Sequence, residues 1–196
     1  IISGNNNNTI NIWDAVTGEE LMTLRGHQGP VRSVSFSHDG KMIVSGSTDK
    51  TIKLWDVSAS RERVTLPPVG AESYFFTISF SPDGKYITSA GPHNQVTIWD
   101  TVKGAERMVL YGHGALVWEA AFSPDGKYIA SGSKDGIVKV WDAATGKELM
   151  TLSAYKGGYD TFTFSPDGRH IAVAGHYEEL RIYNVTTGVE VMKLKG

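Results

Sequence analysis

The chain has 196 residues and a formal net charge of −2, a balance without the broad positive field that non-specific nucleic-acid binding needs. It has no cysteines, which excludes disulfide scaffolds, thiol catalysis and cysteine-ligated zinc, and fits a reducing compartment such as the cytoplasm. No apolar run approaches the roughly 18 residues of a membrane-spanning helix, so we expect neither a membrane nor a nucleic-acid partner.

The first stretch of the chain reads as part of a strand-rich unit. Ile1 to Gly4 match a strand that recurs later, and a polar turn of four asparagines follows. Thr9–Asp14 and Glu20–Leu24 are predicted to be two further strands. Because the chain opens inside a strand pattern and without Met, we expect it to be a fragment of a larger protein.

A full unit of four short strands is predicted in residues 26–69. Its strands are Val31–Ser37, Met42–Ser47, Thr51–Val57 and Glu62–Leu66. In the third of these, Ile52 and Leu54 lie on one face and Trp55 on the other. Apolar side chains on both faces fit a sheet that is stacked between two neighbouring sheets.

The same unit returns at regular intervals along the chain. A partial copy and four full copies occupy residues 1–25, 26–69, 70–111, 112–155 and 156–196. Trp-Asp pairs, with one decayed Tyr-Asn copy, end the third strands at spacings of 42, 44, 42 and 42 residues. These pairs begin at Trp13, Trp55, Trp99, Trp141 and Tyr183. The longer spacing comes from two extra residues within 67–73, before a strand predicted at Tyr74–Ser81.

A fixed period in the forties with a Trp-Asp end predicts an all-β fold, the β-propeller of four-stranded antiparallel blades. Over residues 1–196 we expect one propeller segment of about four and three-quarter blades. This is an incomplete ring, and we expect the parent protein to have about seven blades.

One kind of turn joins the first two strands of each full unit. The turns read Ser37-His38-Asp39-Gly40, Ser81-Pro82-Asp83-Gly84, Ser123-Pro124-Asp125-Gly126 and Ser165-Pro166-Asp167-Gly168. Pro presets the backbone angle φ, Asp caps the turn and Gly accepts a positive φ. Each Asp stands alone, whereas calcium needs six to eight oxygen ligands, so we expect no metal site here.

Four polar residues stand at fixed offsets in the well-formed units. They are His27, Ser45, Asp49 and Trp55 in the second unit, and His113, Ser131, Asp135 and Trp141 in the fourth. Ser, His and Asp together invite a hydrolase interpretation. However, the set occurs twice at equivalent positions, and the chain has no G-x-S-x-G turn. We therefore expect no catalytic residues, no cofactor and no metal.

The motifs Gly-His, Ser-Pro-Asp-Gly, Ser-Gly-Ser-x-Asp and Trp-Asp resemble those of the WD-repeat family, whose fold is the β-propeller. The resemblance covers essentially the whole chain. It implies that Asp bonds the His ring, the His bonds the Ser hydroxyl, and the Ser bonds the indole N–H. Buried polar groups need partners of this kind, and a fully connected network stiffens a blade.

The units depart from this pattern in ways that affect the expected networks. The third unit has Ala71 and His93 at the His and Asp positions. The fifth unit has Tyr155, Val173, Tyr177 and Tyr183 at the four positions. The first unit keeps Ser3 and Trp13 and has Asn7 for Asp. We therefore expect complete networks only in the second and fourth units.

The family resemblance implies a non-catalytic scaffold for protein–protein interaction, with other proteins, peptides or other domains of the parent chain as partners. We expect the binding face to carry the Gly-His loops and the turns between second and third strands. There, the residue after the first apolar position of each first strand should point toward the central opening. These residues are Arg32, Phe76, Trp118 and Asp160.

Two alternatives remain open at this stage. The aromatic rings of Phe76 and Trp118 suggest a contact patch, but they would equally fill the channel or pack on a neighbouring blade. The chain as a whole would also fit a propeller enzyme, a hydrolase or lyase with a central site, or a purely structural spacer in a multidomain signalling protein.

Overall fold

The computed structural model describes residues 1–66, 75, 77–91, 93–153, 159–175 and 179–195. Within these ranges the chain forms nineteen strands and no helix. The strands pair into one three-stranded and four four-stranded antiparallel sheets, and each sheet follows the chain order from its first strand to its last. This confirms the predicted fold class, a β-propeller of antiparallel blades in an incomplete ring.

Each sheet is one blade. The first blade contains β1 (Ile2–Gly4), β2 (Thr9–Trp13) and β3 (Glu20–Arg25). The second contains β4 (Val31–Phe36), β5 (Met42–Ser47), β6 (Ile52–Asp56) and β7 (Arg61–Leu66). The third contains β8 (Thr77–Phe80), β9 (Tyr86–Ala90), β10 (Gln95–Asp100) and β11 (Ala105–Tyr111). The fourth contains β12 (Val117–Phe122), β13 (Tyr128–Ser133), β14 (Ile137–Asp142) and β15 (Glu148–Ser153). The fifth contains β16 (Tyr159–Phe164), β17 (His170–Gly175), β18 (Glu179–Asn184) and β19 (Glu190–Lys195).

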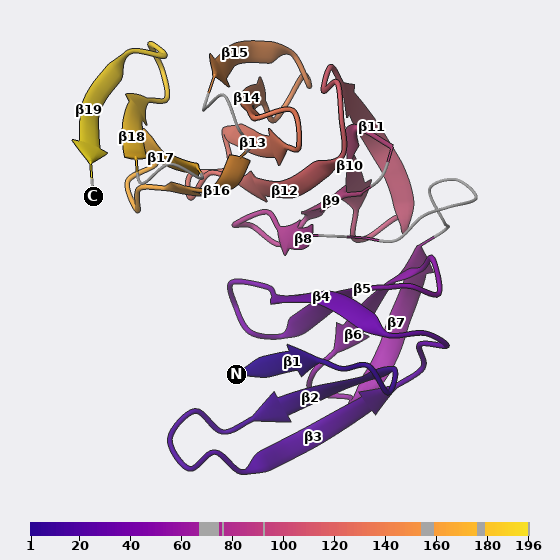
Figure 1. Ribbon diagram of the computed structural model, residues 1–196. Coiled ribbons are helices and arrows are strands. Elements are labelled where there is room, and N and C mark those ends of the chain that lie inside the picture. Colours follow the sequence, from indigo (N-terminus) through magenta and orange to yellow (C-terminus); the bar gives the residue numbers. More distant parts are fainter. Residues whose placement is uncertain (67–74, 76, 92, 154–158, 176–178, 196) are drawn as a thin grey trace.

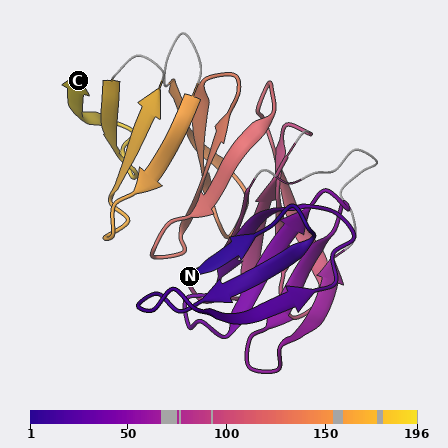
Figure 2. The same ribbon diagram turned by 60° about the horizontal axis from the view of Figure 1, so that its bottom comes forward.

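The blades stand side by side around an open arc (Figures 1 and 2). The first strands β4, β8, β12 and β16 lie on the inner side, and the last strands β7, β11, β15 and β19 lie on the outer side. Because the strands alternate in direction, the loops fall into two sets on two opposite narrow faces. One face carries the Gly-His loops and the turns between second and third strands, and the other carries the Ser-Pro-Asp-Gly turns.

The core of the described residues is divided into apolar clusters between neighbouring blades. Ile10 and Leu24 of the first blade pack with Ile43 and Trp55 of the second. Equivalent clusters join the second blade to the third, the third to the fourth, and the fourth to the fifth. The indole rings of Trp55, Trp99 and Trp141 are almost completely buried. A third strand therefore needs apolar side chains on both faces, as its sequence indicates.

The fifth blade has one apolar face that no other described sheet covers. Leu24, Leu66, Leu110 and Leu152 occupy one position of the outer strand and are all buried. Leu194 occupies the same position in β19 and is 47% exposed. The difference shows that these leucines are buried by the following blade and not by their own sheet.

The third blade begins later than its sequence predicts. The strand predicted at Tyr74–Ser81 is observed only from Thr77, and Tyr74 and Phe76 lie outside the described residues. Phe75 precedes the strand and is only 4% exposed, in the cluster between the second and third blades. A Cβ atom added to Gly46 would lie 2.9 Å from the Phe75 Cβ, so only glycine permits this approach. Phe75 is therefore a core residue and not part of a rim.

Candidate functional site

The first strands carry an irregularity at the positions proposed for the rim. Pairing with the second strand shifts between Val31 and Ser33 in β4 and between Val117 and Glu119 in β12. The same shift occurs in β16, between Tyr159 and Thr161. Each shift leaves one residue unpaired, and these residues are Arg32, Trp118 and Asp160. A β-bulge of this kind re-aims the side chain of the extra residue.

The bulged side chains that are described are exposed. Trp118 exposes 38% of its surface, while Val117 directly before it is completely buried. Arg32 is exposed and donates a hydrogen bond of 3.3 Å from Nη1 to the Oδ1 of Asn6. The side chain of Asp160 and all of Phe76 lie outside the described residues. Of the four rim candidates, the structure thus places Arg32 and Trp118 at equivalent exposed positions.

In the second and fourth blades, the residue after the bulge ties its blade to the next one. Glu119 accepts hydrogen bonds from Thr161 at 3.2 Å and from the Phe162 N–H at 3.3 Å, which joins the fourth blade to the fifth. Ser33 accepts a bond of 3.1 Å from the Ile78 N–H, which joins the second blade to the third. The exposed Trp118 therefore sits between a core residue and an inter-blade bond, so its backbone is firmly held.

A hydrogen-bonded chain of four residues crosses the second blade. The indole of Trp55 donates to Ser45 Oγ at 2.8 Å, and Ser45 bonds the Nε2 of His27 at 2.7 Å. The Nδ1 of His27 then bonds Asp49 Oδ2 at 2.7 Å. Thr51 adds a fifth member, because its hydroxyl donates to Asp49 Oδ1 at 2.6 Å and lies 3.2 Å from His27 Nδ1.

The fourth blade repeats only part of this chain. Trp141 donates to Ser131 at 2.8 Å, and Ser131 bonds His113 Nε2 at 2.8 Å. The Nδ1 of His113 lies 3.6 Å from Asp135, which is within Coulombic reach but too far for a hydrogen bond. This buried nitrogen has no hydrogen-bond partner. The prediction of a complete network in the fourth unit is therefore wrong at its last link, since Ile137 replaces the hydroxyl of Thr51.

Burial and hydrogen bonding set the ionisation of these groups. Burial lowers the pKa of His27 and of His113, and it outweighs the nearby Asp carboxylate in each blade. Burial alone raises the pKa of Asp49, but bonds from Thr51, the Gln28 N–H and His27 prevail and lower it to about 2. A neutral imidazole beside a carboxylate fits donation from Nδ1 to Asp49 and acceptance at Nε2.

This geometry leaves the polar sets without access to a substrate. Ser45 and Ser131 have no exposed surface. Each Ser hydroxyl accepts from an indole and bonds an imidazole, and its burial keeps a substrate from reaching it. Within the described ranges, no three His, Asp or Glu side chains gather as a metal site. No helix long and apolar enough to cross a membrane occurs there either.

The other blades hold shorter remnants of the network. Trp99 donates to Ser89 at 2.8 Å, and Trp13 donates to Ser3 at 2.9 Å. The described His93 is exposed, and Asn7 bonds Thr9 within its own turn. In the fifth blade Val173 and Tyr183 are buried in an apolar cluster. The other network positions, Ala71, Tyr155 and Tyr177, lie outside the described residues.

A second polar group, which joins the third strand to the outer strand, was not predicted. Lys53 bonds Glu62 at 2.8 Å and Thr65 at 2.7 Å in the second blade. Lys139 bonds Glu148 at 2.8 Å and Thr151 at 3.0 Å in the fourth. The signal was available in the sequence, because Lys, Glu and Thr recur at the same offsets in these two units.

Five antiparallel blades, four of them with a Trp–Ser bond, define an open β-propeller with blades of the WD type. The family model described as "WD domain, G-beta repeat" matches residues 18–56, 68–100 and 104–142, more than half of the chain. The chain therefore belongs to the WD-repeat family.

Two curated relatives share short stretches with the chain. The nuclear distribution protein PAC1 of Mycosarcoma maydis is 41% identical over 44 residues, which is 22% of this chain and 10% of that protein. The ribosome biogenesis protein WDR12 homolog of Ixodes scapularis is 47% identical over 36 residues, which is 18% of this chain and 8% of that protein. Each match thus covers about one repeat unit and at most a tenth of the relative.

Proposed function

We propose that this chain is a non-catalytic scaffold segment that binds a partner protein on the face bearing the Gly-His loops. The observation that carries the proposal is the exposed Trp118, which a β-bulge turns out of β12 at the position that Arg32 occupies in β4. Trp and Arg are the residues most enriched among those that dominate protein–protein binding energy. A firmly held aromatic ring on a rim therefore suits a contact patch.

The proposed patch has four members, two of them placed by sequence register alone. Phe76 and Asp160 complete the set with Arg32 and Trp118, because each follows the first apolar residue of its strand. The blade boundaries 1–25, 26–69, 70–111, 112–155 and 156–196 belong to the same proposal. The partner is another protein, a peptide or another domain of the parent chain.

Two features support a scaffold over an enzyme. The Ser and His groups that would form a hydrolytic site are buried and already bonded to one another. The names of the two relatives refer to nuclear distribution and ribosome biogenesis, so the same repeat serves unrelated processes. A common frame with variable surface residues fits this use.

Truncation of the exposed aromatic ring tests the proposal. In the intact parent protein, Trp118→Ala should weaken binding to the partner by about 2 kcal/mol, roughly a thirtyfold change in affinity, because anchor aromatics lose this much when truncated. Quantitative co-purification of partners with the wild type and the variant identifies the bound protein, and titration with that protein measures the change.

Control variants lie on the opposite narrow face. Lys103→Ala and Lys147→Ala, near the outer turns, should leave the affinity unchanged, and all variants should keep the melting temperature of the wild type. If binding survives Trp118→Ala and Arg32→Ala but is lost in the Lys variants, the face is assigned wrongly.

A further inference from the structure

Three adjoining hollows lie on the narrow face opposite to Trp118, among the Ser-Pro-Asp-Gly turns of the second, third and fourth blades. Their volumes are about 330, 270 and 210 Å³. Pro82 lines all three, Phe122 lines the two larger ones, and Asp83 lines the two smaller ones. Because they share these lining residues, the hollows adjoin one another across three blades, and we refer to them together as the groove.

The largest of the three hollows lies where the inner strands end, and its lining includes the polar residues His38, Ser81 and Ser123. Phe36, Phe80 and Phe122, the last residues of β4, β8 and β12, line it together with Pro82 and Pro124. Each blade thus contributes one ring, and the partly exposed rings of Phe36 and Phe122 remain accessible. A concave site of stacked aromatic and proline side chains suits one large apolar side chain of a ligand.

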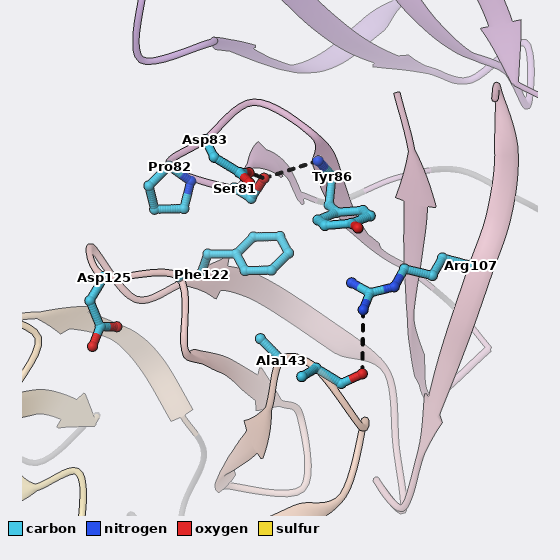
Figure 3. A pocket seen from close by; sticks show the side chains of 10 residues that line it. Ser81, Pro82, Asp83, Tyr86, Arg107, Phe122, Asp125 and Ala143 are labelled. Atoms are coloured by element: carbon cyan, nitrogen blue, oxygen red, sulfur yellow. Dashed lines mark hydrogen bonds between the residues drawn. The ribbon is translucent and has the colours of Figure 1, made fainter. Parts of the chain in front are cut away.

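The second hollow lies in the wedge between the third and fourth blades (Figure 3). Phe122 lies in its middle, with Asp125 on one side and Arg107 on the other. The Arg107 guanidinium is already engaged, since it sits 4.2 Å from the centre of the Tyr86 ring and donates to the Ala144 carbonyl at 3.3 Å. The wedge thus already accepts one guanidinium against an aromatic ring.

Three carboxylates and one guanidinium line the groove, and each carboxylate lies within ion-pair distance of an exposed lysine. Asp39, Asp83 and Asp125 line the two smaller hollows. Among the described lining residues, Arg107 is the only one that is a lysine or an arginine. In each Asp the Oδ1 atom holds its own turn, through bonds from a Ser hydroxyl and a Lys N–H. The Oδ2 atoms of Asp83 and Asp125 meet only the exposed ammonium groups of Lys85 and Lys127, at 3.2 and 3.3 Å.

Such exposed ion pairs contribute little, so a cation from a ligand can replace either lysine at small cost. Aromatic rings and carboxylates in the lining of one hollow are also groups that a Lys or Arg side chain binds, through cation–π contact and charge-assisted hydrogen bonds. The groove therefore complements a basic side chain next to an apolar one.

We propose that this groove binds an extended peptide segment of a partner protein that carries an apolar and a basic side chain two residues apart. In an extended segment, side chains two residues apart lie on the same side about 6.6 Å from each other. The apolar side chain fills the hollow of Phe36, Phe80 and Phe122, and the basic one enters the wedge between Asp83 and Asp125. This site is separate from the Trp118 patch, so the two proposals stand or fall independently.

The test uses the intact parent protein and fluorescent peptides of the sequence Gly-Ala-Arg-Ala-Phe-Ala-Gly. Binding is measured by fluorescence anisotropy. The parallel peptides carry Glu in place of Arg, or Ala in place of Phe. We expect saturable binding of the first peptide and at least tenfold weaker binding of the other two.

Protein variants with a matched control locate the site. Asp83→Asn and Asp125→Asn keep the oxygen that holds the turn but lose the charge, so each should weaken binding several-fold. Asp167→Asn makes the same change in the fifth blade, where the turn has the same bonds but lines none of the three hollows, and should leave binding unchanged. Trp118→Ala should also leave it unchanged.

Three outcomes overturn the proposal. They are the absence of saturable binding by the wild type, equal binding of the Glu peptide, and equal losses in Asp125→Asn and Asp167→Asn. A fourth result also overturns the proposal. If Trp118→Ala loses peptide binding and the Asp variants do not, the peptide binds on the opposite face.

Discussion

The second and fourth blades carry the same four polar residues but bond them to different extents. In the second blade the chain runs unbroken from the Trp55 indole to Asp49, with His27 and Asp49 only 2.7 Å apart. In the fourth blade the corresponding His113–Asp135 distance is 3.6 Å, and the buried Nδ1 lacks a hydrogen-bond partner. The residue type at each of the four positions therefore does not determine whether the network closes.

We attribute the difference to the residue two places after the Asp. Thr51 donates to Asp49 and lies within reach of the His27 ring, so it holds the carboxylate toward the imidazole. Ile137 offers only its backbone N–H to Asp135, at 3.0 Å. A buried network thus depends on a neighbouring hydroxyl that is not one of the four His, Ser, Asp and Trp residues.

The largest difference between the blades should appear on removal of the Asp. Asp49→Ala leaves His27, Thr51 and two backbone N–H groups without their hydrogen-bond partner. It should lower the free energy of unfolding by about 3 kcal/mol, the upper end for buried groups that lose a partner. Asp135→Ala breaks only two backbone bonds and should cost about 1 kcal/mol. Urea denaturation followed by tryptophan fluorescence measures both, and equal losses would contradict the comparison.

Exchange of Thr51 and Ile137 should make the hydrogen-bond network of each blade resemble that of the other. Thr51→Ile should destabilise the chain by about 1 kcal/mol, because the carboxylate loses a hydroxyl donor. Ile137→Thr should let Asp135 approach His113, and Asp135→Ala should then cost more in the Ile137→Thr background than in the wild type. A double-mutant cycle detects this coupling. Its absence would show that backbone geometry, and not the hydroxyl, keeps His113 and Asp135 apart.

Acid should weaken the fold in two stages. His27 and His113 have pKa values lowered by burial, so the unfolded chain binds more protons, and stability present above pH 6.5 falls as the pH drops below that value. The contribution of Asp49 is present above pH 3.8 and is lost as the pH falls toward its folded pKa of about 2. Hydrogen bonds and lysine partners also lower the pKa of other carboxyls, such as Glu62 and Asp83, so the second stage persists without Asp49 but should be smaller. Urea midpoints measured against pH should therefore fall less between about pH 4 and about pH 2 in Asp49→Asn than in the wild type. An equal fall in both proteins would refute the role of Asp49.

The second and fourth blades should differ least in the Lys, Glu and Thr groups that join the third strand to the outer strand, because these groups have the same bonds in both blades. Lys53 and Lys139 each bond a Glu and a Thr at similar distances, so Lys53→Met and Lys139→Met should change stability equally, within about 0.5 kcal/mol. Unequal effects in paired denaturation curves would mean that the two blades differ by more than the His–Asp link.

Much of the fold could be predicted because its signals are local and repeated. The Trp-Asp period and the Ser-Pro-Asp-Gly turns predict the blades, and Met42–Ser47 and His170–Gly175 are observed with the predicted bounds. The core position of Phe75 depends on Gly46 in another blade, so no local pattern reveals it.

The candidate sites were less predictable for a related reason. The four rim positions could be chosen by register, but the bulges at Arg32 and Trp118 are visible only in the strand pairing. The His113–Asp135 distance of 3.6 Å, against 2.7 Å for His27–Asp49, depends on how two loops approach each other and not on the residue types. The groove around Phe122 is built by three blades, so its residues stand more than forty positions apart in the sequence.

The buried networks are connected to the proposed binding face by short loops. Arg32 and Trp118 lie five residues after His27 and His113, in the two blades whose His bonds a buried Ser. Each His therefore anchors the loop that leads into its rim residue. Our central claim is that the buried networks hold these two rim positions in place, the second blade more tightly than the fourth.

Amide hydrogen exchange of residues 26–33 and 112–119 tests this claim most directly, with the wild type compared with His27→Ala and His113→Ala. We predict slower exchange in 26–33 than in 112–119 in the wild type, and at least a tenfold loss of protection in each variant, confined to its own segment. Unchanged exchange around Trp118 in His113→Ala, or an equal loss in every blade, would contradict the claim.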